Sequence, residues 1–220
     1  MSVDATREFE LELLHAGAPL VIGMDEVGRG AIAGPVTVGV CVVSRETVDA
    51  PPGLRDSKLL SPARREALAP LVREWALVAC GSASAGEIDE LGISACLGLA
   101  GKRALIALHE SGVRVGEAVV VLDGSHNWLT PALGSPLRVV TRTKADRDCA
   151  VVAGASIVAK VERDGVMVSL SSEHIGYGWE GNKGYGSAGH FDAIERLGAT
   201  VHHRRTWLHA TPGVGLLHDG

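Results

Sequence analysis

The stretch of residues 20–43, LVIGMDEVGRGAIAGPVTVGVCVV, decides the fold. Its apolar ends, 20–24 and 36–43, have the length and the valine content of buried strands. An acidic pair, Asp25 and Glu26, follows the first apolar run directly, and several glycines stand behind it. This pattern predicts two strands joined by a tight, glycine-rich turn that carries two carboxylates.

Outside this stretch, apolar runs and helical spacing alternate along the chain. Ser61 supplies an N-cap, and Pro70 is expected to end or kink the helix that begins there. Strands that come first and then alternate with helices predict an α/β fold with a mixed sheet. We expect one domain over 1–220, with a core at about 20–168 and a helical C-terminal extension at about 169–220. Further strands are expected at 75–83, 118–122 and 137–141, and helices at 3–15, 61–69, 88–110, 150–168 and 191–197.

The composition is that of a globular protein in a reducing compartment. Of 220 residues, 46% are hydrophobic and 21% are charged, which excludes wholesale disorder. The net charge of −5 excludes a strongly basic nucleic-acid coat but not a local basic cleft. Four cysteines without a C-x-x-C pair indicate reduced, buried thiols. The N-terminus lacks a signal peptide's apolar region, and no apolar run approaches the ~20 residues of a membrane span, so we expect a cytoplasmic protein.

Four acidic residues stand out by their position. Asp25 and Glu26 follow the first strand, Asp123 ends the run 118–122, and Asp146 precedes the helix at 150–168. Side chains at strand ends and helix starts can meet at one sheet edge, where their mutual repulsion requires cations. Oxygen ligands select Mg²⁺ or Mn²⁺, and two such ions ~3.5–4 Å apart suit phosphoryl hydrolysis. The alternatives are separate surface carboxylates and a glycosidase pair, although the chain has few aromatic residues for sugar stacking.

Two glycine-rich segments are candidates for ligand contact. In Gly28-Arg29-Gly30 the backbone can approach a phosphate or a sugar hydroxyl closely, with Arg29 as a charged clamp. In WEGNKGYG, residues 179–186, Tyr185 can stack on a sugar or base while Lys183 meets a phosphate. A glycine-requiring turn and an ordered surface loop remain the simpler interpretations of the two segments.

Basic residues near these segments are candidates for one wall of a nucleic-acid cleft. Lys160 and Arg163 are three residues apart and share a helix face. The full candidate set is Lys58, Arg138, Arg142, Lys144, Arg147, Lys160, Arg163, Lys183, Arg204 and Arg205. For each of these residues, the alternative interpretation is a solvent-exposed charge on the surface of a helix. The adjacent His202 and His203 indicate packing or surface groups rather than zinc ligands.

Six short segments occur in a recognisable order. They are DEVGRG (25–30), DSKLL (56–60), VLDG (121–124), KAD (144–146), GASIVAKVERD (154–164) and GYGWEGNKGYGS (176–187), the last followed by His190. Together they resemble the type 2 ribonuclease H family, ribonuclease HII, from about residue 20 to residue 207.

The resemblance implies a ribonuclease H-like fold, in which a five-stranded mixed sheet is flanked by helices. It implies hydrolysis of the RNA strand of RNA–DNA hybrids and incision 5′ to single ribonucleotides in duplex DNA, leaving 5′-phosphate and 3′-hydroxyl ends. By the family's pattern, Asp25, Glu26, Asp123 and Asp146 are the catalytic acids that bind Mg²⁺ or Mn²⁺. The family's substrate-contacting positions correspond to Gly28, Arg29 and Gly30 for the 2′-hydroxyl, Tyr185 for the junction sugar, and Lys58, Ser156 and Lys160 for phosphates.

The sequence departs from the family at a few positions. Leu59, Gly154 and Ser187 replace residues that the family often has, and 213–220 lack the aromatic pair of a sliding-clamp-binding tail. We therefore expect a monomer without a C-terminal clamp motif. Three other classes stay open: a different carboxylate nuclease such as a junction resolvase or transposase-like enzyme, a non-catalytic nucleic-acid-binding protein, and a metal-dependent phosphatase of small molecules.

Overall fold

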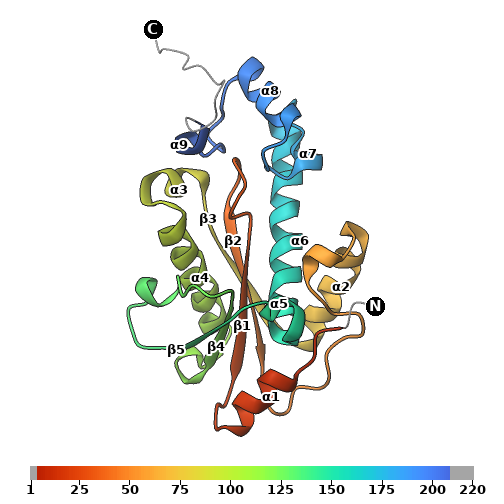
Figure 1. Cartoon of the computed structure of the whole chain (residues 1–220), viewed down its shortest axis with the longest axis vertical. Helices are drawn as coiled ribbons and strands as arrows, with labels where there is room; N and C mark the ends of the chain where they lie inside the picture. The colour runs from red at the N-terminus through yellow and green to blue at the C-terminus, as the bar shows by residue number, and fades with distance from the viewer. Residues whose placement is uncertain (1–3, 209–220) are drawn as a thin grey trace.

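A five-stranded mixed sheet forms the centre of the computed structural model, which describes residues 4–208 (Figure 1). The strands lie in the order β3-β2-β1-β4-β5. Antiparallel pairs join β1 to β2 and β2 to β3, whereas β4 runs parallel to both β1 and β5. The strands are β1 (Val21–Val27), β2 (Val36–Val43), β3 (Leu77–Ala83), β4 (Val119–Asp123) and β5 (Arg138–Arg142). The predicted α/β class and mixed sheet are confirmed.

Helices cover both faces of this sheet. Those of the described residues are α1 (Glu8–His15), α2 (Pro62–Trp75), α3 (Ala85–Leu91), α4 (Ile93–Glu110), α5 (Ala145–Asp148), α6 (Ala150–Glu173), α7 (Trp179–Asn182), α8 (Ala188–Leu197) and α9 (Arg205–Leu208). In Figure 1, α4 lies on one side of the sheet, and α6 with α2 lies on the other. No described helix is long and apolar enough to cross a membrane.

The alternation of side chains along β2 explains the two layers. Val36, Val38 and Val40 belong to the core on the α4 side, whereas Cys41 and Val43 belong to the core on the α6 side. Successive strand residues point to opposite faces, so a strand covered on both sides is apolar throughout. All eight residues of β2 are buried, as this double coverage requires.

The small residues at the start of α6 bring this helix against the sheet. A Cβ atom on Gly39 would overlap the backbone oxygen of Ala155, and one on Gly23 would overlap the backbone of Val151. Helix α6 therefore lies directly on β1 and β2, with no side chain between the backbones at these points. The prediction that this small-residue helix exists is confirmed, although it continues beyond residue 168 to Glu173.

A third hydrophobic cluster joins the far end of α6 to the C-terminal helices. It contains Ala33, Met167, Tyr177, Trp179, Ala193, Ile194 and Leu208. Because Ala33 belongs to the β1–β2 loop, this cluster packs against the segment that follows the acidic pair. The expectation about a clamp-binding tail at 213–220 lies outside the described residues.

Several predicted boundaries were wrong, and the helix predicted at 3–15, for example, begins only at Glu8. Helix α2 continues through Pro70 to Trp75, because buried Leu68, Ala69 and Val72 on either side of the proline pack toward α6. The helix predicted at 88–110 is two helices, which meet at Gly92 with a φ of 79°. Strand β1 extends to Val27, so the acidic pair lies within the strand rather than after it.

The close approach of α6 generates the first prediction. Gly39→Ala should lower the free energy of unfolding by about 3 kcal/mol, because the new methyl group meets backbone atoms that cannot rotate away. Urea titration measures this change. The control is Gly165→Ala, an exposed position on α6 with open space around it, which should gain up to about 1 kcal/mol from helix propensity. Equal stability of the two variants would contradict the packing described here.

Candidate active site

The parallel pairing of β1 with β4 brings carboxylates from distant parts of the sequence to one sheet edge. Met24 pairs with Leu122, so Asp25 and Asp123 are the next residues on adjacent strands. Asp146 lies in α5, and its backbone N–H donates a hydrogen bond of 3.4 Å to the Asp123 carboxylate. The four predicted acids are therefore grouped at this edge, as the positions of Asp25, Glu26, Asp123 and Asp146 in the sequence predicted.

The electrostatics of the group reflect this crowding. Burial raises the pKa of Asp25 to about 8, and repulsion from Glu26 and Asp123 adds to the shift, while a hydrogen bond from Ser156 opposes it. Burial also raises the pKa of Glu26, against the opposing charge of Arg29. The pKa of Asp146 is raised by burial and then by Asp123. Negative charge at this edge is costly unless a cation is close.

Two cationic side chains of the protein face the carboxylates. The Lys58 ammonium lies 3.5 Å from Asp146, and the Arg29 guanidinium lies 3.7 Å from Glu26. Burial by itself lowers the pKa of Lys58, but Asp25 and Asp146 outweigh it, so the net direction is upward. Lys58 thus stays charged and partly compensates the acidic group.

The donor set of the edge fits a hard divalent cation. Carboxylate oxygens from β1, β4 and α5 are the ligands that Mg²⁺ and Mn²⁺ prefer, and their mutual repulsion favours such an ion. Within residues 4–208, no three acidic, histidine or cysteine side chains already stand in the arrangement that holds a metal ion. The fit therefore rests on the chemistry of the oxygens and on their convergence at one sheet edge.

A cavity of about 300 Å³ lies beside the carboxylates. Its lining includes every site residue that the family resemblance implies except Asp123 and Asp146. It is formed by Asp25, Glu26, Val27, Gly28, Arg29, Gly30, Ser57, Lys58, Ser156, Lys160 and Tyr185. A Cβ atom on Gly30 would meet nothing within 4 Å, so the backbone there is open to a ligand.

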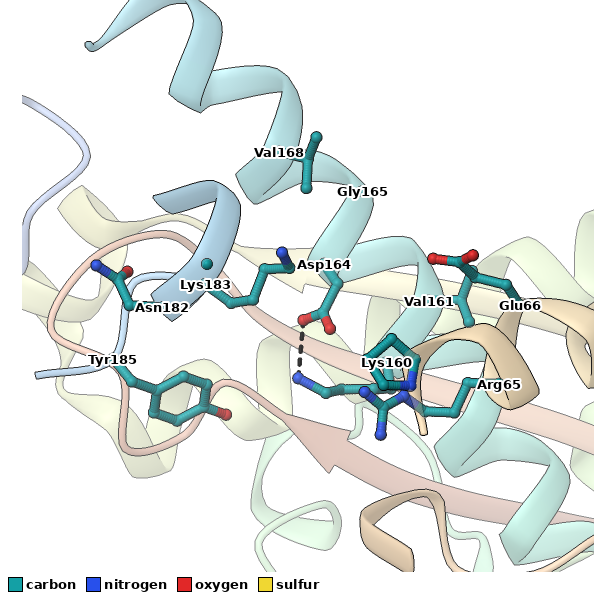
Figure 2. Close-up of a pocket in the computed structure, with 12 residues that line it drawn as sticks. Arg65, Glu66, Lys160, Val161, Asp164, Gly165, Val168, Asn182, Lys183 and Tyr185 are labelled. Carbon is teal, nitrogen blue, oxygen red and sulfur yellow. Dashed lines mark hydrogen bonds and ion pairs between the residues drawn. The ribbon is translucent and has the colours of Figure 1, made fainter. Parts of the chain in front are cut away.

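A second cavity of about 560 Å³ continues from the first between α2, α6 and the loop after α7 (Figure 2). Lys160 and Tyr185 line both cavities and mark the boundary between them. Figure 2 shows Lys160 paired with Asp164, at 2.8 Å, and the Tyr185 ring extending toward this pair. The Lys160 ammonium lies 5.8 Å from the centroid of that ring.

Two arginines assigned to a basic wall by the sequence are instead fully buried. Arg204 donates to the carbonyl oxygens of Gly28, Arg29 and Gly34, at 2.6 to 3.3 Å. Arg163 donates to the carbonyl oxygens of Ala33, Pro35 and Lys183, at 2.8 to 3.2 Å. The basic-wall prediction was wrong for both, because their donors bind backbone rather than facing solvent.

The position of Arg163 also explains one of the glycines. Gly28 has a φ of 81°, and a Cβ atom there would overlap the guanidinium of Arg163. A side chain at this position would therefore be strained and would displace the arginine. The loop after β1 depends on this glycine and on the two buried cations together.

Asp56 and Arg65 support the cavity, and sequence reasoning gave neither a role. Asp56 is buried, and its carboxylate accepts a 2.8 Å hydrogen bond from the backbone N–H of Lys58. Arg65 donates to the carbonyl oxygens of Ser57 and Leu60. The signal for Asp56 was its place beside Lys58 in DSKLL, whereas nothing local distinguishes Arg65 from an exposed helix charge.

Comparisons with known proteins identify the family. The model of the family described as Ribonuclease HII matches residues 22–210. The chain is 46% identical over 194 residues to ribonuclease HII of Streptomyces avermitilis, covering 88% of this chain and 78% of that one. It is 42% identical over 191 residues to ribonuclease HII of Roseobacter denitrificans, covering 87% and 91%.

Comparison with solved structures leads to the same family. Ribonuclease H2 from Pyrococcus horikoshii OT3 superposes with a TM-score of 0.65 at 26% identity, covering 86% of this chain and 93% of that one. The enzyme in the PCNA:RNase HII complex from Archaeoglobus fulgidus gives 0.64 at 26% identity, covering 86% and 95%. The chain belongs to the ribonuclease HII family of divalent-metal-dependent hydrolases, which cleave the RNA of RNA–DNA hybrids.

The buried arginine at the glycine loop generates the second prediction. Arg204→Gln should destabilise the protein by about 3 kcal/mol, because several carbonyl oxygens lose charged donors inside the protein. Hydrogen exchange should also increase selectively at 28–35. Urea titration and exchange mass spectrometry measure both effects. The neighbouring exposed Arg205→Gln is the control, and an equal loss in that variant would contradict a specific role for Arg204.

Proposed function

Starting from this family membership, we propose that the enzyme incises duplex DNA on the 5′ side of a single ribonucleotide, besides cleaving hybrids. The observation that carries the proposal is the cavity in which Asp25, Glu26, the Gly28–Gly30 backbone and Tyr185 lie together. One site then offers groups for phosphodiester chemistry and groups for reading a sugar hydroxyl.

Asp25, Glu26, Asp123 and Asp146 would hold two Mg²⁺ or Mn²⁺ ions. Metal ions held there would supply activation of a water for in-line attack and charge stabilisation at the leaving 3′-oxygen, chemistry that would give 5′-phosphate and 3′-hydroxyl ends. Ser156 is buried, with its hydroxyl 2.8 Å from that of Ser57 and hydrogen-bonded to Asp25. Its proposed task is thus to orient the Asp25 carboxylate rather than to bind a phosphate directly.

The loop after β1 would read the 2′-hydroxyl, the group that distinguishes RNA from DNA. The backbone at Gly30 is open, and the Arg29 side chain is 52% exposed while its head stays near Glu26. The buried Arg204 holds the carbonyls of Gly28 and Arg29, so the loop meets the substrate in one conformation. A rigid reader loses little entropy when the ribose binds.

Tyr185 and the larger cavity would hold the strand beside the ribonucleotide. Tyr185 is 37% exposed at the boundary of the two cavities, where a sugar can stack on its ring. Lys160 and Lys183 line the continuation of the groove, where a phosphate backbone would pass. The C-terminal part from about residue 169 supplies Lys183 and Tyr185, which supports its role as a substrate-binding extension.

We also propose that the enzyme acts in the cytoplasm. Cys41, Cys80, Cys96 and Cys149 are all free thiols, and three of them are buried. This pattern fits a reducing compartment.

The test is cleavage of a labelled DNA duplex that contains one ribonucleotide, with Mg²⁺, Mn²⁺ or chelator, beside an all-DNA control. The expected result is a metal-dependent nick on the 5′ side of the ribonucleotide and none in the control. Cutting of a long hybrid but not of this duplex would be consistent with hybrid cleavage but would refute the proposed recognition of single ribonucleotides. Cutting of the all-DNA control would favour a different carboxylate nuclease.

The third prediction concerns Asp123→Asn. Cleavage should fall by about 100-fold or more, since the lost charge contributes several kcal/mol to the transition state, while affinity for the uncut duplex should remain close to wild type. Single-turnover cleavage and fluorescence anisotropy measure the two quantities. Near-normal activity of this variant in Mg²⁺ would refute the assignment of the acids.

The fourth prediction concerns Lys160→Ala. If Lys160 contacts a phosphate, the slope of log affinity against log salt should become shallower by about one unit. The control is Lys102→Ala. Lys102 is exposed and lies on α4, the helix that covers the opposite face of the sheet (Figure 1). Anisotropy titrations at several salt concentrations provide the slopes. An unchanged slope for Lys160→Ala would show that the bound nucleic-acid strand does not contact Lys160.

A further inference from the structure

We propose that His190 is a positioning residue that holds the backbone of Tyr185, and with it the aromatic ring, at the boundary of the two cavities. The inference rests on the proposed function, in which Tyr185 contacts the substrate sugar. His190 lies on α8, is fully buried, and touches neither cavity. It would act through Tyr185 rather than on the substrate.

The contacts of the His190 ring define its role. Nδ1 lies 2.9 Å from the carbonyl oxygen of Tyr185. Nε2 lies 3.0 Å from Nε1 of Trp179 and 3.1 Å from Nε2 of His203. On the far side, Nδ1 of His203 lies 2.9 Å from the backbone N–H of Thr200.

The partners of these contacts assign the ring protons. The Trp179 indole can only donate, so Nε2 of His190 must accept, and the ring proton lies on Nδ1, from which it is donated to Tyr185. The Thr200 N–H likewise requires Nδ1 of His203 to accept, so the proton of His203 lies on Nε2 and shares the single lone pair of His190 Nε2 with the Trp179 indole. Both imidazoles are therefore neutral, and an extra proton on either ring would oppose a donor.

The surroundings support this neutral arrangement. Tyr177 and Trp179 stack with ring centroids 5.1 Å apart, and the rings of His190 and His203 pack against them. Burial lowers the pKa of His190, and burial followed by repulsion from His190 lowers that of His203 to about 4.

The hydrogen bond to Tyr185 is distinct from those that hold the preceding residues. The carbonyl of Lys183 accepts from Arg163, and that of Gly184 accepts from the backbone N–H groups of Ile32 and Ala33. The carbonyl of Tyr185 instead accepts from α8. Loss of the His190 donor would therefore free the carbonyl of Tyr185, the residue that carries the ring, while its N–H stays bound to the carbonyl oxygen of Asn182 and the loop before it stays attached.

A matched pair of variants separates positioning from simple packing. In His190→Asn the amide nitrogen stands near the place of Nδ1 and can still donate to Tyr185. In His190→Gln the side-chain amide stands near the place of Nε2. The contacts with Trp179 and His203 therefore survive, and the hydrogen bond to the Tyr185 carbonyl is lost. Tyr177→Phe is the control, because it removes a partly buried hydrogen bond to Gly198 from the same cluster without touching Tyr185.

The structural readout does not depend on activity. The chain has two tyrosines, so 3-fluorotyrosine labelling should give two ¹⁹F resonances, which Tyr177→Phe assigns. In His190→Gln the Tyr185 resonance should shift and sharpen, and in His190→Asn it should stay near the wild-type position. Imidazole ¹⁵N spectra of the wild type should show the Nδ1–H tautomer for His190 and the Nε2–H tautomer for His203.

The catalytic readout is kcat/KM on the single-ribonucleotide duplex. We expect about a tenfold loss for His190→Gln, the equivalent of one hydrogen bond, and a smaller loss for His190→Asn. Equal behaviour of the two variants in both readouts, or the Nε2–H tautomer at His190, would overturn the proposal. If the tautomers and the ¹⁹F pattern hold but the wild type does not incise the ribonucleotide, the proposed function fails and the positioning of Tyr185 stands.

Discussion

The binding of backbone carbonyls by two buried guanidinium groups is the interaction on which the rest of the site depends. Arg163 and Arg204 have no carboxylate partner among their described contacts, and their positive charges are met by carbonyl dipoles. Buried charges are costly unless they are fully hydrogen-bonded, so the loops must supply those carbonyls in a fixed geometry. The arginines thereby join the glycine loop after β1, the loop after α7 and helix α6 into one unit.

The carboxylate edge follows from a different constraint, the closeness of α6 to the sheet. Where Gly23 and Gly39 leave no room for side chains, the helix backbone lies against β1 and β2, and Ser156 comes within reach of Asp25. The parallel β1–β4 pair then aligns Asp123 with the same edge. The acidic group is thus a product of backbone packing on one side and strand direction on the other.

The sequence predicted those parts of the molecule that depend on local pattern. The strands, the small-residue helix and the positions of the acids follow from apolar runs, glycine spacing and charge, and the motif order identified the family. Whether Arg204 is buried depends on a hydrogen-bonded pocket formed by residues 170 or more positions away, so no local signal exists. The same holds for Pro70, because only the packing of its neighbours against α6 tells whether the helix continues.

This difference between local and distant information also explains how the site is divided. The acids are strand and helix residues whose place is set by the sheet, whereas the loop after β1 and Tyr185 are held by side chains from α6, α8 and the segment 200–204. In the proposed function, phosphodiester cleavage would use the same carboxylates for every substrate, but discrimination of one sugar hydroxyl would need a rigid reader. The buried arginines and the neutral histidine pair would supply that rigidity with hydrogen bonds to backbone, and the side chains of Arg29 and Tyr185 would then meet the substrate.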